Sequence, residues 1–194
     1  KMRSVKFNRQ EVVDQATSLF WEKGFHATSM RDIQAVTGLH PGSIYTSFGS
    51  KEALFKEALQ NYSRLAKELL NQHVATNPSP IAALKSFIKD VVVEQGRTMP
   101  SEHCMLVKSI AELTEDNPIL LAESRDLLAN LGDLFALLLS KAQGQGEVST
   151  ERTPQRLARM LQMQIMGLRA FASTNQDDQQ VLELIDDLFL ALQY

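Results

Sequence analysis

Six candidate contacts to phosphates or base edges lie between residues 31 and 51 of this 194-residue chain. They are a guanidinium, an imidazole, two aliphatic hydroxyls, a phenol and an ammonium group: Arg31, His40, Ser43, Tyr45, Thr46 and Lys51. A guanidinium can donate two hydrogen bonds to one guanine, whereas an ammonium or a phenol suits a phosphate oxygen. The set predicts contact with double-stranded DNA, provided that one surface presents it.

Two short helices joined by a tight turn are the elements that would present these side chains. Thr28 or Ser29 can cap the first helix, and Asp32 lies in its first turn, where a carboxylate suits the positive end of the helix dipole. Gly38 stands at the turn, because a left-handed backbone costs glycine little. Pro41 fits the first position of the second helix, since its fixed φ angle suits that site. This layout is typical of DNA-binding helix-turn-helix units.

Apolar residues mark the inner side of both helices. Ile33 and Val36 would form the inner edge of the first helix, and Leu39 would fill the turn. Ile44 and Phe48, four residues apart, would form the inner edge of the second helix. The residues left on or near its outer face are His40, Gly42, Ser43, Tyr45, Thr46 and Ser47. Such a face fits a major groove, although a buried hairpin with a solvated polar edge would show the same apolar pattern.

Residues 7–59 resemble the DNA-binding domain of the tetracycline-repressor (TetR) family of bacterial regulators. The resemblance is carried by the runs TSMRDI, GLHPGSIYTSF and GSKEALF between Thr28 and Phe55. Two positions depart from the family pattern. His40 stands where the family usually has a Ser or Thr helix cap, and Gln34 stands where it usually has Ala. His40 is therefore either a weak cap or a substitute contact to the duplex.

The resemblance implies a role for each candidate DNA contact. The expected phosphate ligands are Thr28, Tyr45 and Lys51. The residues expected nearest the base edges are Arg31, Pro41, Gly42, Ser43 and Thr46. Phosphate contacts set the register of a protein on DNA, whereas contacts to base edges read its sequence.

The resemblance also implies an all-α fold of about nine helices. A three-helix DNA-binding domain is expected at residues 6–60, and a helical domain for effector binding and dimerisation at residues 61–194. The apolar pattern agrees, because it has helical spacing throughout and nowhere the alternation of a strand. In the second domain, helices are expected near residues 81–95, 102–115, 118–142, 154–173 and 177–192. The long helix that begins at Lys51 should contain the domain boundary.

The last two expected helices carry more apolar surface than one core should require. In the resembling family this pair joins its twin in a four-helix dimer interface, and a homodimer would place two reading helices in successive major grooves. The residues expected at that interface are Leu157, Leu161, Leu168, Val181, Ile185, Leu188, Phe189 and Leu192. The alternative is a hairpin that closes the core of its own chain.

An apolar or amphipathic small-molecule effector is expected in the second domain. The candidate lining residues are Phe87, Cys104, Met105, Lys108, Phe135, Met160, Met163 and Met166, because soft and aromatic side chains adapt to apolar ligands. Lys108 and Glu112, four residues apart, would either orient a polar group of the ligand or form a surface pair. Cys104 is either a small packing residue or an oxidation and electrophile sensor.

Charge is distributed as a DNA-binding protein requires. The net charge of the whole chain is −3. Residues 1–51 contain seven Lys/Arg and four Asp/Glu, whereas the rest contains 13 and 19, so the basic excess lies with the helix-turn-helix pattern.

Other functions find little support in the sequence. It contains no phosphate-binding glycine loop and no HExxH, and its four histidines share no metal-ligand spacing, so we expect no enzyme activity, no cofactor and no metal. The longest apolar run, residues 134–139, is far shorter than the ~20 residues that cross a membrane. The single cysteine and the absence of a signal-peptide pattern favour a cytoplasmic protein.

The sequence therefore predicts a ligand-responsive transcriptional repressor that binds a palindromic operator as a homodimer. One alternative is a redox- or electrophile-sensing regulator that acts through Cys104. The other is a regulator of the same type that activates transcription and has no small-molecule effector.

Overall fold

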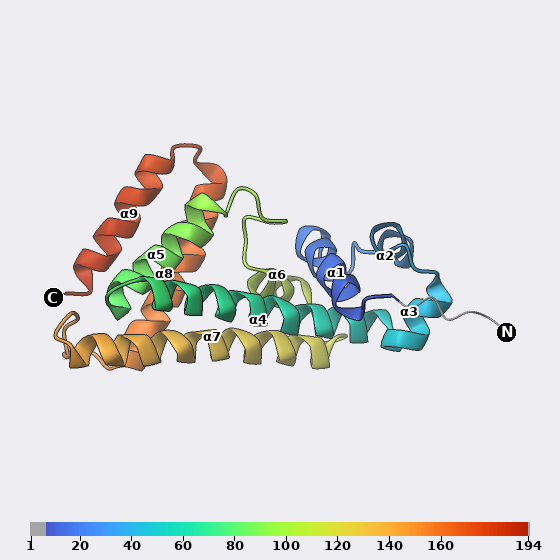
Figure 1. The fold of residues 1–194 in the computed structure, drawn as a ribbon, viewed down its shortest axis with the longest axis horizontal. Coiled ribbons are helices and arrows are strands. Elements are labelled where there is room, and N and C mark those ends of the chain that lie inside the picture. The colour runs from blue at the N-terminus through green and yellow to red at the C-terminus, as the bar shows by residue number, and fades with distance from the viewer. Residues whose placement is uncertain (1–6, 194) are drawn as a thin grey trace. The chain divides into compact units, whose positions relative to one another are not determined.

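The computed structural model describes residues 7–193, and within that range the chain is all-α (Figure 1). Nine α-helices and one short π-helix are present there, and no strand. They are α1 (Arg9–Lys23), α2 (Met30–Thr37), α3 (Pro41–Phe48), α4 (Lys51–Thr76), α5 (Pro80–Lys89), the π-helix η1 (Asp90–Glu94), α6 (Met105–Glu112), α7 (Pro118–Gly144), α8 (Pro154–Thr174) and α9 (Asp178–Ala191). The predicted fold class is confirmed.

The helices form two compact units. Unit 1 joins residues 7–62 to Met105–Arg125, and unit 2 joins Ser63–Cys104 to residues 126–193. The first division lies inside α4, close to the predicted boundary at residue 60. The predicted second domain differs from unit 2, because α6 and the start of α7 pack with the N-terminal helices; residue 6, the predicted start, lies outside the described range.

The core of unit 1 is built from one side of each short helix and the first turns of α4. Phe20 of α1 and Phe55 of α4 meet edge to face, with ring centroids 4.9 Å apart. Ile33 of α2 and both predicted inner residues of α3, Ile44 and Phe48, are buried with them. Val36 is exposed, which corrects its predicted place on the inner edge of α2. An eight-residue helix has room for few buried positions, and Ile33 takes the central one.

Local signals set the ends of α2 and α3. Ser29, rather than Thr28, caps α2: its hydroxyl accepts from the Asp32 amide at 3.1 Å, and the Asp32 carboxylate accepts from the Ser29 amide at 2.7 Å. Gly38 follows with a left-handed backbone (φ 68°), and Pro41 opens α3. The predicted turn chemistry is therefore present in the structure.

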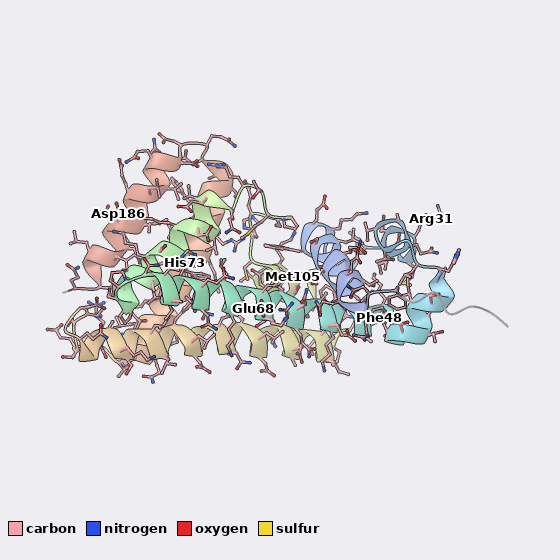
Figure 2. The ribbon with its side chains drawn as sticks, in the orientation of Figure 1. Arg31, Phe48, Glu68, His73, Met105 and Asp186 are labelled. Atoms are coloured by element: carbon pink, nitrogen blue, oxygen red, sulfur yellow. The ribbon has the colours of Figure 1, made fainter. Side chains whose placement is uncertain are left out.

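The core of unit 2 lies among α5, α8 and α9, with residues of α4 and α7 (Figure 1). Leu84, Ile88, Leu161, Val181 and Ile185 are fully buried there. A polar cluster adjoins it around His73, which Figure 2 labels: His73 Nε2 lies 2.9 Å from Asp90 Oδ2, and His73 Nδ1 lies 2.9 Å from Ser86 Oγ. Each of these polar atoms thus has a partner, as burial requires.

The capping box of α2 predicts a pH dependence. Hydrogen bonds from Ser29 and Lys23 hold the pKa of the Asp32 carboxyl well below its usual range. Asp32 therefore contributes stability that is fully present above about pH 4 and is lost as the pH falls below that value. We expect the free energy of unfolding in urea to fall less between pH 5 and pH 2.5 for Asp32→Asn than for the wild type. Glu115→Gln, at an exposed carboxylate of the same unit, should retain the wild-type slope.

Candidate nucleic-acid interface

The core of unit 1 determines which side of α3 is exposed. Ile44 and Phe48 project inward, and Arg9 covers the Phe48 ring with its guanidinium carbon 4.5 Å from the ring centroid. Leu39 fills the turn as predicted, being buried. With one side of the helix fixed in this way, the opposite side faces solvent.

Most of the predicted DNA contacts lie on that exposed side or at its margin. Tyr45 is the largest of them, with 49% of its surface exposed. Ser43 is half-buried. The others are exposed, namely Arg31 on α2, His40 before α3, and Pro41, Gly42 and Thr46 on α3. Figure 2 labels Arg31 on α2 and the buried Phe48 on α3. His40 occupies the cap position of α3 but makes no side-chain cap hydrogen bond, so its imidazole is not used as a cap. The Thr46 hydroxyl donates to the Gly42 carbonyl at 2.7 Å and keeps its lone pairs as acceptors.

The structure corrects the predicted role of Thr28 as a phosphate ligand. Its side chain is completely buried, and its hydroxyl donates to the Gly24 carbonyl at 2.6 Å. A buried hydroxyl cannot reach a phosphate of the duplex. Thr28 holds the turn before α2 instead, and its position beside a good helix cap made the two roles hard to separate from sequence.

Lys51 begins α4 with its ammonium nitrogen 4.3 Å from the centroid of the Phe25 ring. Burial lowers the pKa of Lys51, and the nearby carboxylates Glu52, Glu112 and Asp32 act against that shift. The side chain is half-buried, so its ammonium group contacts the face of Phe25 and still keeps access to solvent.

The predicted effector residues have different surroundings within their own units. Phe87, Met105 and Phe135 are buried core side chains, while Met163 is 61% exposed. The half-buried members are Cys104, Met160 and Met166. Lys108 belongs to unit 1, where its ammonium donates to the Trp21 carbonyl at 2.7 Å. Helical spacing made these side chains look alike, although they serve different cores and surfaces.

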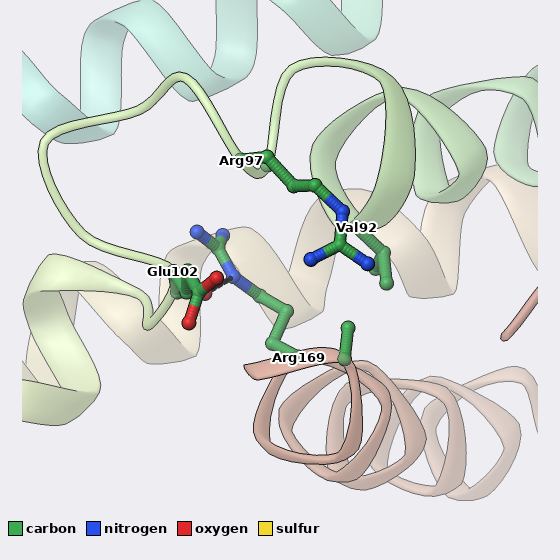
Figure 3. Close-up of a pocket in the computed structure, with 6 residues that line it drawn as sticks. Val92, Arg97, Glu102 and Arg169 are labelled. Atoms are coloured by element: carbon green, nitrogen blue, oxygen red, sulfur yellow. Dashed lines mark hydrogen bonds between the residues drawn. The ribbon is translucent and has the colours of Figure 1, made fainter. Parts of the chain in front are cut away.

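A pocket in unit 2 has a different lining: Val92, Gly96, Arg97, Glu102, Arg169 and Ala172 (Figure 3). Its enclosed space is about 10 Å³, room for one group the size of a water molecule. Arg97 pairs with Asp178, and the buried Arg169 donates to the Glu102 carbonyl at 2.7 Å. Both guanidinium groups therefore hold parts of the chain together, and the pocket as it stands has room for one water-sized group.

The structure also corrects seven of the eight predicted dimer residues, because it buries them within their own chain. Leu157, Leu161 and Leu168 of α8 are buried in the core of their own chain, and Leu188 of α9 is half-buried. The four remaining members are equally buried: Val181, Ile185, Phe189 and Leu192. The exposed apolar side chains of these two helices are others, namely Met163, Phe171, Leu184 and Leu190. The apolar periodicity was correct, but it could not tell which edge the chain covers itself.

Between residues 7 and 193 no group of three or more His, Cys, Asp or Glu side chains could hold a metal ion. None of the helices described is both long enough and apolar enough to cross a membrane.

Comparison with known proteins agrees with the geometry of α2 and α3. Residues 12–58 match the model for bacterial regulatory proteins of the tetR family. The chain is 24% identical to YezE, an HTH-type transcriptional regulator of Bacillus subtilis (strain 168), over 95% of both chains. It is 25% identical to the HTH-type transcriptional repressor ComR of Escherichia coli (strain K12), over 84% of this chain and 78% of ComR. A solved complex of a cysteine mutant of the TetR-family regulator CifR with 26-bp operator DNA has the same fold, with a TM-score of 0.82 and 20% identity over 98% of this chain and 99% of CifR. Residues 12–58 thus form a DNA-binding domain of the tetR type, in a chain whose relatives are helix-turn-helix transcriptional regulators.

Proposed function

We propose that this regulator is a repressor that binds a near-palindromic operator as a homodimer and releases it when a small molecule binds to unit 2. The observation that carries the DNA-binding part is the exposed side of α3, held outward by the burial of Ile44 and Phe48. CifR in complex with operator DNA and the repressor ComR, both similar to this chain, support the same function.

In this proposal, Tyr45 and Lys51 contact phosphates, whereas Arg31 and Ser43 read bases. Arg31 is exposed and forms no ion pair with another described residue, so its guanidinium is available for a guanine edge. Pro41 and Gly42 present little side chain at the start of α3, which lets the backbone approach the floor of the groove. His40 and Thr46 flank them as secondary contacts.

A homodimer is proposed because two reading helices about 34–36 Å apart reach successive major grooves. The exposed apolar side chains of α8 and α9 support an interface on these helices, with Met163, Gly167 and Phe171 recurring every fourth residue along α8. Glycine at the centre of that stripe would let a partner helix approach closely. The proposed interface is thus formed by the exposed edge of α8 and not by the buried leucines that the sequence suggested.

The phosphate contacts predict uniform losses of affinity. Lys51→Ala should weaken binding to all DNA sequences alike and lower the slope of log affinity against log salt by about 1, because one counterion fewer is released. Tyr45→Phe should weaken binding by about 0.5–1.5 kcal/mol with an unchanged slope, since it removes a neutral donor. Fluorescence anisotropy at four salt concentrations measures both effects. Wild-type affinity in both variants would contradict the proposed reading face.

The base contact predicts a loss of discrimination instead. Arg31→Ala should reduce the preference for the native base at one position of each half-site by about 1–3 kcal/mol. The measurement is selection of bound duplexes from random-sequence DNA, followed by sequencing. Lys51→Ala is the matched control, because it also removes one positive charge but should select the wild-type consensus. An unaltered consensus from Arg31→Ala would exclude its role in base reading.

The dimer predicts a change of assembly. Met163→Glu and Phe171→Glu should shift the protein from dimer to monomer, because a carboxylate would be buried without a partner in an apolar interface. Sedimentation velocity across a tenfold concentration range measures the shift. Gln155→Glu places a charge on an exposed α8 position outside the apolar stripe and should leave the dimer intact. A dimer that persists in both stripe variants would argue for another interface.

A further inference from the structure

The turn between α1 and α2 is held by a side chain from a distant part of the sequence. The Glu112 carboxylate, at the end of α6, accepts from the Phe25 amide at 2.9 Å and from the His26 amide at 2.6 Å. Both amides lie just beyond the end of α1, where no helical carbonyl serves them. One carboxylate therefore supplies an acceptor to each of two neighbouring amides of this turn.

A second side chain of α6 holds the end of α1 itself. Lys108, one helical turn before Glu112, donates to the Trp21 carbonyl at 2.7 Å and to the Glu22 carbonyl at 3.0 Å. These carbonyls belong to the last turn of α1, where a cation is favoured by the helix dipole. Burial lowers the pKa of Lys108, while the carboxylates of Glu112 and Glu22 oppose that shift. The positive and negative side chains of α6 are thus matched to the carbonyls and the amides of the same helix end.

Gly24 shows how closely Glu112 approaches the turn. A Cβ atom at Gly24 would lie 2.6 Å from Glu112 Oε2, and the backbone there has φ 85°. A residue with a side chain would have to displace the carboxylate. Glycine, which has no side chain, thus occupies the position where α6 contacts the turn.

The same turn leads directly into the helix-turn-helix. Phe25 is buried, the Thr28 hydroxyl donates back to the Gly24 carbonyl, and Ser29 begins α2 as its cap. Few freely rotating bonds separate the amides held by Glu112 from the start of α2. We propose that Glu112, with the support of Lys108, is a positioning residue for DNA binding, because it fixes the direction in which the chain enters α2. This inference rests on the reading face proposed above.

Removing the charge of Glu112 tests the proposal, because a positioning role and simple electrostatics change DNA affinity in opposite directions. A carboxylate in the DNA-binding unit repels phosphates, so its removal should by Coulomb's law alone tighten binding slightly. The positioning role requires the opposite result at Glu112. Glu115 is the matched control, because it is exposed, lies in the same unit and carries the same charge.

The experiment uses the full-length protein and a duplex that the wild type selects from random-sequence DNA. Operator affinity is measured by anisotropy and divided by the affinity for a duplex of unrelated sequence, with the folded fraction of each variant known from circular dichroism. Glu112→Gln keeps one acceptor but brings an NH₂ group against the second amide, and we expect its specificity ratio to fall at least tenfold. Glu115→Gln should retain the wild-type ratio, with equal or slightly tighter binding to both duplexes.

A merely structural role for Glu112 would lower the melting temperature but leave the specificity ratio of the folded protein unchanged. That result would overturn the proposal. If Glu112→Gln does not fold, Lys108→Met serves as the test variant, because water can solvate the Trp21 and Glu22 carbonyls that lose their donor. A threefold or larger loss in the specificity ratio of Lys108→Met supports positioning. A wild-type specificity ratio contradicts it. Failure of the wild type to select any sequence would instead remove the proposed function itself, which separates the two conclusions.

Discussion

The burial of Ile44 and Phe48 is the constraint on which the rest of the DNA-binding unit depends. An eight-residue helix is too short to be stable alone in water, so α3 exists because its inner side packs against the core. The same packing decides which residues remain outside. Arg9 adds to it by lying over the Phe48 ring while pairing with Glu57 at 2.6 Å, which ties the start of α1 to α3 and α4. The same contacts therefore serve stability and function, because packing the inner side of α3 into the core leaves its other side exposed to solvent.

Local chemistry explains why the helix-turn-helix could be predicted from the sequence. The left-handed turn at Gly38, the proline that opens α3 and the capping box of α2 each depend on residues within four positions of one another. Signals of this kind are complete in a short window of sequence. The helical class of the second domain could be predicted for the same reason, since apolar spacing within one helix is enough to indicate it.

Residues whose role depends on a distant part of the chain could not be placed in this way. On α8, Leu161 and Met163 are two positions apart and equally apolar, yet one is in the core and the other is exposed. Periodicity reports that a helix has apolar edges and does not report which neighbour covers them. Thr28 presented the same difficulty, because a hydroxyl before a helix suits a cap, a phosphate or a carbonyl, and only the carbonyl of Gly24 lies within reach. Lys108 and Glu112 looked like a surface pair or a ligand site, since their partners lie some 87 positions earlier in the chain.

The two carboxylates beside the reading helices show how a DNA-binding unit accommodates negative charge. Asp32 accepts from the Ser29 amide and hydroxyl and pairs with Lys23, while Glu112 accepts from two backbone amides. Hydrogen bonds from such donors spread the negative charge over the donor groups, so each carboxylate presents a weaker field to a phosphate than a bare one would. Alanine at either position would remove a repulsion but would also leave the backbone of a turn without its acceptors. Because the turn directs α2, and α2 carries the proposed base contact Arg31, we expect geometry to outweigh charge at these two positions. Acidic side chains can then lie beside the proposed reading face of a unit that binds a polyanion.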